Sequence, residues 1–162
     1  MTLVSTQDKV DNSVAGGTAR DHSISALRRL NIYSPKEEIP DEDVRFVLSE
    51  LNSMLQSWVY ENAIVSFSKY NLNDVVGLNI GGNGNFLYFD DVIIYNLCMR
   101  LIEVYDATPR AFQQISDGAK TSLDMLINMK RNLEGDFQSD FDKTLSNTPN
   151  NRHYYGLMRG GE

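Results

Sequence analysis

Residues 41–61 read DEDVRFVLSELNSMLQSWVYE and carry the clearest helical pattern in this chain of 162 residues. Apolar residues recur there at steps of three and four, which is the period of a helix with one buried face. Pro40 precedes the stretch, and three acidic residues in the first turn favour the positive N-terminal end of a helix. The sequence therefore predicts an amphipathic helix roughly 30 Å long, around which the rest of the domain is organised. Its apolar stripe consists of Val44, Val47, Leu48, Leu51, Leu55, Trp58 and Val59.

Two further helices are expected on either side of this one. Residues 22–31 predict a short helix with Ser23 as its N-cap, because a serine side chain accepts a hydrogen bond from the free N–H groups of a first turn. Residues 91–106 predict a helix capped by Asp90. That helix is apolar nearly all the way round, so we expect it to be central and buried.

A fourth helix is expected to begin at Thr108 and Pro109, because proline suits the first helical position, and to stop at Gly135. Before the third helix, residues 64–70 alternate imperfectly like a strand, and residues 85–89 are expected to return beside them. The predicted fold class is mainly α: a small bundle of about four helices with an irregular or β-hairpin insert and extended N- and C-terminal arms.

The chain is expected to divide into an N-terminal arm at 1–20, a helical domain at 21–135 with the insert 62–89, and a C-terminal arm at 136–162. Without the arms and the insert the core is small, and so small a core is only marginally stable by itself. The C-terminal arm is nevertheless rich in apolar and aromatic residues, and we expect it to bind another chain. The alternative is a strand folded back on the domain. The expected interface residues are Phe137, Phe141, Leu145, Arg152, His153, Tyr154, Tyr155, Leu157, Met158 and Arg159.

Composition excludes several functional classes. The net charge of -7 argues against a general phosphate-binding role, because nucleic-acid binding normally needs a basic face. The same charge fits a surface that DNA slides past without sticking. Cys98 is the single cysteine, so no internal disulfide forms. The N-terminus does not resemble a signal peptide, and the longest apolar stretch, 92–105, is too short to cross a bilayer, so we expect a soluble protein without membrane contact.

No catalytic, cofactor or metal site is expected. The run GGNGN at 81–85 lacks the Gly-Lys-Ser/Thr ending of a phosphate loop, and we interpret it as a loop tip. The isolated histidines His22 and His153 are expected at surface or interface positions, and Cys98 as a buried thiol. The carboxylates expected in the first turns of helices are Asp41, Glu42, Asp43, Asp90 and Asp91. The arginines expected at helix surfaces or in salt bridges are Arg28, Arg29 and Arg100.

Three stretches carry a family resemblance. They are SALRRLNI at 25–32, the acidic-start helix that closes on Trp58, and IYNLCMRL at 94–101, which runs on to Tyr105 and a proline-led helix. In this order the pattern resembles the head-to-tail adaptor family of short-tailed double-stranded DNA phages, also described as tail accessory or DNA-packaging stabilisation factors. The resemblance covers about residues 23–132 and includes no catalytic motif.

The resemblance implies a small helical protein that assembles as a homo-oligomeric ring, a dodecamer in this family, beneath the portal protein. It implies that the C-terminal arm docks on the portal, that the lower face receives the tail nozzle or tail hub protein, and that the ring helps to retain packaged DNA. DNA would pass through the channel without sequence-specific binding. The expected location is the neck of the virion, and the host cytoplasm during assembly.

Two other functions stay open. A virion-associated enzyme that degrades peptidoglycan could use carboxylates such as Glu61, Asp90 or Asp91. A small DNA-binding protein could use the helices at 22–31 and 41–61, although the connection at 32–40 is longer than that of a helix-turn-helix.

Overall fold

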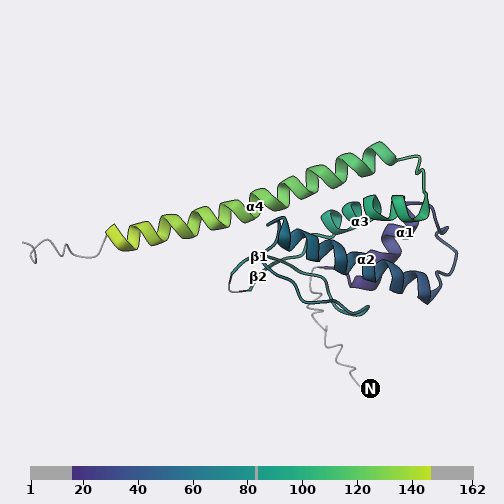
Figure 1. Ribbon diagram of the computed structural model, residues 1–162, viewed down its shortest axis with the longest axis horizontal. Helices are drawn as coiled ribbons and strands as arrows, with labels where there is room; N and C mark the ends of the chain where they lie inside the picture. Colours follow the sequence, from purple (N-terminus) through teal and green to yellow (C-terminus); the bar gives the residue numbers. More distant parts are fainter. Residues whose placement is uncertain (1–15, 83, 147–162) are drawn as a thin grey trace, which may run out of the picture.

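The computed structural model describes residues 16–82 and 84–146, with side chains up to Asp136. In this part of the chain the protein is mainly helical, with four helices and one small antiparallel hairpin, as the sequence predicts. Helices α1, α2 and α3 form a body with the hairpin at one end, and α4 lies across α3 and continues far beyond this body (Figure 1).

Helix α1 spans Ala19–Arg29 and begins earlier than predicted. Thr18 is its N-cap, and the Asp21 side chain accepts from the backbone N–H of Thr18 in return, which completes a capping box. Hydrogen bonding from Thr18 holds the pKa of Asp21 below its usual value. Ser23, the predicted cap, lies instead inside the helix, where its hydroxyl donates to the carbonyl of Ala19 at 2.8 Å. That prediction was wrong, because the true cap lies five residues earlier.

The end of the predicted N-terminal arm also belongs to the fold. The backbone N–H groups of Ala19 and Arg20 donate to the carbonyls of Asp74 and Leu72, each at 2.9 Å. Thr18 also forms an antiparallel bridge with Val75. The arm therefore cannot extend to residue 20, and residues 1–15 lie outside the described part of the chain.

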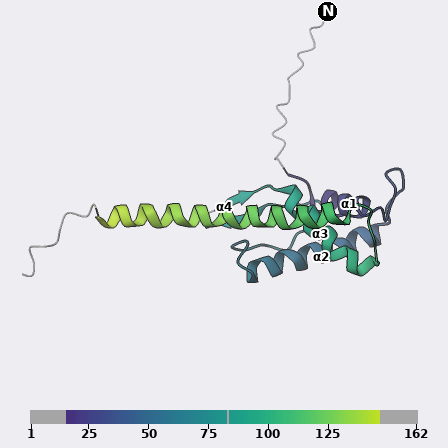
Figure 2. The same cartoon turned by 90° about the horizontal axis from the view of Figure 1, so that it is seen from above.

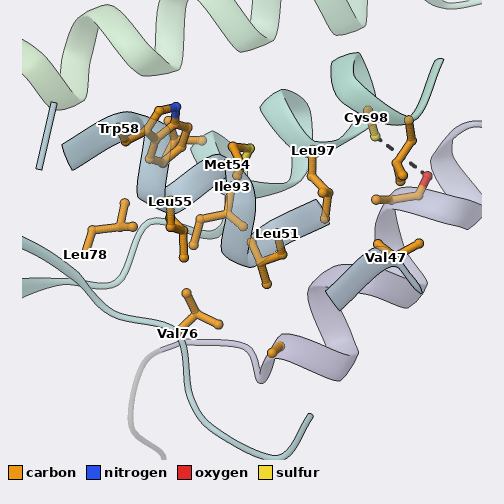
Figure 3. Close-up of a cluster of buried hydrophobic side chains, with 14 of the residues drawn as sticks. Val47, Leu51, Met54, Leu55, Trp58, Val76, Leu78, Ile93, Leu97 and Cys98 are labelled. Carbon is orange, nitrogen blue, oxygen red and sulfur yellow. Dashed lines mark hydrogen bonds between the residues drawn. The ribbon is translucent and has the colours of Figure 1, made fainter. Parts of the chain in front are cut away.

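Helix α2 spans Asp41–Tyr60 and confirms the central prediction. Its apolar face is buried in the core, and Trp58 is 3% exposed. In Figure 3, Leu51, Met54, Leu55 and Trp58 lie in a row along this helix, opposite Ile93 and Leu97 of α3. Burial of this stripe is the main apolar contribution of α2 to the stability of the domain.

The hairpin consists of β1, Leu78–Gly81, and β2, Asn85–Leu87. The returning strand predicted at 85–89 is confirmed over its first three residues, but the strand predicted at 64–70 was wrong. Instead, the backbone of Tyr70 is held by the Asn52 side chain, whose Oδ1 accepts from its N–H at 2.8 Å and whose Nδ2 donates to its carbonyl at 3.1 Å. Because a helix side chain satisfies these groups, this segment runs beside α2 as irregular chain, with one bridge between Ser66 and Asn79.

The insert at 62–89 is part of the core rather than an addition to it. Ala63, Ile64, Val76, Leu78 and Ile80 are all buried in the same cluster as the helices. Figure 3 shows Val76 below Leu55 of α2, and Leu78 to the left of Leu55. The predicted core left out residues 62–89 and was therefore too small, because these side chains add to the buried apolar volume.

Helix α3 spans Asp90–Tyr105 and ends at Asp106, which adopts the left-handed conformation with φ 47°. Phe89 is its N-cap residue and makes no side-chain cap, so the prediction that Asp90 is the cap was wrong. The helix is buried at Val92, Ile93, Leu97, Cys98 and Leu101, as expected, but Val104 in its last turn is 51% exposed. The prediction of a central, buried helix is therefore corrected in its last turn.

Helix α4 spans Phe112–Ser146. It begins later than the predicted start at Thr108 and Pro109, and it does not stop at Gly135. A single glycine in a helix costs about 1 kcal/mol relative to alanine, which does not outweigh propagation of a long helix. The first eleven residues of the predicted C-terminal arm, 136–146, are therefore helical.

Candidate docking surface

The first half of α4 packs firmly on the body. Ile115, Ala119 and Leu126 are buried against α3 and the hairpin. Gly118 lies so close to the ring of Tyr95 that an added Cβ would meet its Cε1 at 2.9 Å, which explains the absence of a side chain at this position. This half of α4 is therefore fixed relative to α3.

Lys130 and Leu133 are the last residues of α4 up to Asp136, where the described side chains end, that pack on the body. Lys130 is 3% exposed, and its ammonium donates to the side-chain oxygen of Asn62 and to the carboxylate of Glu134, each at 2.8 Å. A buried ammonium needs such partners, because an unpaired buried charge is costly. Among the side chains that the structure describes, which end at Asp136, Leu133 is the last apolar one that packs against the core, and Glu134, Gly135 and Asp136 are exposed.

The helix nevertheless continues to Ser146. At 1.5 Å per residue, the thirteen positions beyond Leu133 extend it by about 20 Å. Figures 1 and 2 show this segment, residues 134–146, projecting away from the body in two perpendicular views. We call it the projecting end of α4.

Apolar residues recur at every fourth position along α4, from the body into the projecting end. A residue repeated at this step forms a ridge on the helix surface, the element by which helices pack together. The ridge starts on the body at Met125 and Met129, which are 46% and 37% exposed. An isolated helical segment of this length is only marginally stable in water, so packing is needed to maintain it. The ridge consists of Met125, Met129, Leu133, Phe137, Phe141 and Leu145.

Three of the predicted interface residues, Phe137, Phe141 and Leu145, therefore share one helix and its ridge. The other seven lie outside the described residues: Arg152, His153, Tyr154, Tyr155, Leu157, Met158 and Arg159. Met125 and Met129 were not among the predicted interface residues, although the step of four that connects them to Phe137 is present in the sequence.

A second surface feature is a shallow groove of about 550 Å³ along the outer side of α2. We call it the α2 groove. Its wall opposite α2 is the irregular segment at 67–70, which Asn52 holds in place through the hydrogen bonds to Tyr70 described above. Leu48 and Phe67 are partly buried residues in its lining, and the cationic side chains Arg45 and Lys69 also line it.

A third feature is a groove of about 590 Å³ between α2, α3 and α4. It is of similar size but of opposite character, because Glu50, Glu61 and Glu103 line it. Arg100 also lines this groove, and its Nε lies 3.5 Å from Oε2 of Glu50. This salt bridge agrees with the position predicted for Arg100, at a helix surface or in a salt bridge. We call this the acidic groove.

His22 is 1% exposed, so the prediction of a surface or interface position was wrong. Its Nε2 lies 2.9 Å from Oδ1 of Asp90, and its Nδ1 lies 2.8 Å from the carbonyl of Thr18. The same carboxylate oxygen accepts from the N–H of Gly17 at 3.2 Å. Asp90 thus joins the starts of α1 and α3, a structural role that explains its position in the first turn of α3.

The other predicted site residues lie as follows. Asp41, Glu42 and Asp43 are in the first turn of α2, and Asp91 is in that of α3, as predicted. In the glycine-rich run, Gly81 ends β1 and Asn85 begins β2, and Gly84 before β2 has φ 82°. Arg28 is exposed, as predicted. Arg29, predicted at a helix surface or in a salt bridge, is exposed and stacks over Tyr95, 4.4 Å from the ring centroid.

Cys98 is buried, as predicted, and its thiol lies 3.7 Å from the carbonyl of Ala26. Burial raises the pKa of the Cys98 thiol to about 12. We expect it to resist a thiol reagent at pH 8 in the native protein, because the thiolate fraction is about a thousandfold below that of an ordinary cysteine. Absorbance of released thionitrobenzoate checks this. Reaction at the rate seen in denaturant would contradict it.

Among the described residues, no group of three histidine, cysteine, aspartate or glutamate side chains is placed to hold a metal ion. Within the same part of the chain, no helix has the length and apolar character needed to cross a membrane. No model of a known protein family matches the sequence, and no curated protein matches it significantly.

Proposed function

We propose that this protein is a structural head-to-tail connector of a tailed phage, which forms a ring beneath the portal and docks to it through the C-terminal arm. In this role it receives the tail nozzle or hub protein and helps to retain packaged DNA in the virion. The resemblance of residues 23–132 to the adaptor family supports this proposal.

The observation that carries the proposal is the projecting end of α4. A helix that leaves its own body and continues its apolar ridge offers a binding surface to another chain. The interface residues expected at 152–159 follow directly after this helix. The body therefore serves as a platform from which the segment from residue 134 onward reaches other chains.

The acidic charge of the chain also supports a conduit rather than a DNA-binding protein. A net charge of -7 repels the phosphate backbone, so DNA passes a ring of such subunits without being held.

Deletion of residues 147–162 tests the docking role. We expect the truncated protein to lose binding to the portal protein of the same genome, because it lacks most of the predicted interface residues. It should keep its helical content, because all four described helices end by Ser146. Co-sedimentation with portal measures docking, and far-ultraviolet circular dichroism is the control for folding. Unchanged co-sedimentation of the folded truncated protein would refute the docking assignment.

A further inference from the structure

The projecting end of α4 needs a partner that its own body cannot supply. Its ridge residues Phe137, Phe141 and Leu145 follow Leu133 at steps of four in the same helix. Because α4 runs away from the body in both views (Figures 1 and 2), this end cannot reach the α2 groove of the same chain unless the helix breaks. Any groove that receives it must belong to another molecule.

We propose that the projecting end of α4 in one copy of this chain docks in the α2 groove of a second copy. The lengths agree. The groove follows α2 from Arg45 to Gln56, which is about 16 Å along the helix axis. Residues 136–146 of the projecting end span about 15 Å. A second hollow of about 450 Å³ shares Arg45 and Leu48 with the groove and extends away from it toward Leu72 and Asp74.

The groove is also suited to apolar side chains and is already formed. Leu48 on α2 and Phe67 on the opposite segment give it apolar contacts. Asn52 fixes the distance between the two walls, because its amide is hydrogen-bonded to the backbone of Tyr70 and to the carbonyl of Leu48. A partner helix therefore meets a surface that needs little reorganisation.

Charge decides which groove is used. The projecting end contains four acidic residues, Glu134, Asp136, Asp140 and Asp142, and one basic residue, Lys143. Arg45 and Lys69 of the α2 groove are exposed, and neither is in an ion pair among the described residues. The acidic groove would repel the same helix through its three glutamates. The cationic side chains of the α2 groove thus attract the acidic helix, and the glutamates of the acidic groove repel it, so that charge selects the α2 groove.

This contact joins two different surfaces, so each copy uses its projecting end on one neighbour and its groove on the other. Such a head-to-tail contact generates a ring when its rotation closes. Closure into a ring rests on the proposed function, whereas the contact between two copies does not. An eleven-residue helix buries less than the standard interface of about 800 Å² per partner, so the contact is weak until several copies are held together.

Disulfide cross-linking between two variants tests the contact. One variant carries Ser49→Cys in the α2 groove, and the other carries Thr144→Cys in the projecting end. We expect oxidation of their mixture to give a covalent heterodimer. Cys98 does not compete, because its thiol is buried and stays protonated. The matched control replaces Ser49→Cys by Ser57→Cys, a serine of the same helix that lines the acidic groove, and its cross-linking with Thr144→Cys should be at least tenfold slower.

Charge exchange gives the second arm of the test. Adding Arg45→Glu and Lys69→Glu to the groove variant should reduce cross-linking at least tenfold. Adding Asp140→Lys and Asp142→Lys to the other variant should restore it. Equal rates for both grooves, or no recovery on charge exchange, would overturn the inference. If cross-linking fails but the full chain still binds portal, the contact is wrong and the connector function stands. If cross-linking occurs but portal is not bound, the connector function fails alone.

Discussion

Replacing Leu126 by alanine is expected to lower the free energy of unfolding by about 3 kcal/mol. Leu126 is 0% exposed and lies on the face of α4 that is buried against the body. Truncation removes apolar contacts and leaves a cavity that its neighbours fill only in part, so the loss exceeds the transfer free energy of the side chain. Small domains have total stabilities of 5–15 kcal/mol, so this is a large fraction.

Met125→Ala is the matched control, because it is adjacent in sequence, lies on the same helix and is 46% exposed. We expect it to change the free energy of unfolding by about 0.5 kcal/mol or less. Urea unfolding followed by circular dichroism at 222 nm measures both variants. If Leu126→Ala were no less stable than Met125→Ala, the packing of α4 on the body would be wrong.

Replacing His22 by alanine is expected to cost about 2–3 kcal/mol of unfolding free energy. The ring is buried, and both of its nitrogens lie within hydrogen-bonding distance of acceptors, the carboxylate of Asp90 and the carbonyl of Thr18. Removal leaves the Thr18 carbonyl without its side-chain partner and opens a cavity between the starts of α1 and α3. Asp90→Asn should cost about 1 kcal/mol, because its side chain is half-exposed and water replaces part of the interaction.

Arg28→Ala is the control for this series, because Arg28 lies on the exposed side of the same helix. Its effect should stay within about 0.5 kcal/mol. Chemical denaturation at pH 7 followed by tryptophan fluorescence compares the variants, since Trp58 is the single tryptophan and lies in the core. Equal stabilities of His22→Ala and Arg28→Ala would show that the His22 contacts do not support the fold.

The features that the sequence predicts well depend on local information. The apolar residues of α2 recur at helical period within its twenty residues, and this pattern alone predicts which face of the helix is buried. The hairpin turn at Gly84 is similarly local, because a residue with φ of 82° favours glycine. The location of α3 follows from its long apolar run.

The features that the sequence analysis misses depend on partners far along the chain. Asn52 holds Tyr70, eighteen residues away, and this contact replaces the strand expected at 64–70. His22 meets Asp90 across 68 residues, and no spacing rule indicates that pairing. The length of α4 depends on propagation through Gly135, where the local stop signal was overestimated.

The candidate docking surface was predicted in part. The apolar residues Phe137, Phe141 and Leu145 are visible in the sequence, but their place on a helix that leaves the body is not. The α2 groove could not be predicted from the sequence, because its two walls come from α2 and from an irregular segment that only the fold brings together.

The most direct test of the connector function is multi-angle light scattering on the purified full chain, alone and mixed with the portal protein of the same genome. Because the contact between copies is weak, we expect mostly monomer at micromolar concentration when the chain is alone. Mixing should produce a large complex of fixed stoichiometry, from which the copy number follows. A chain that stays monomeric in the presence of portal, with the portal mass unchanged, would contradict the connector function.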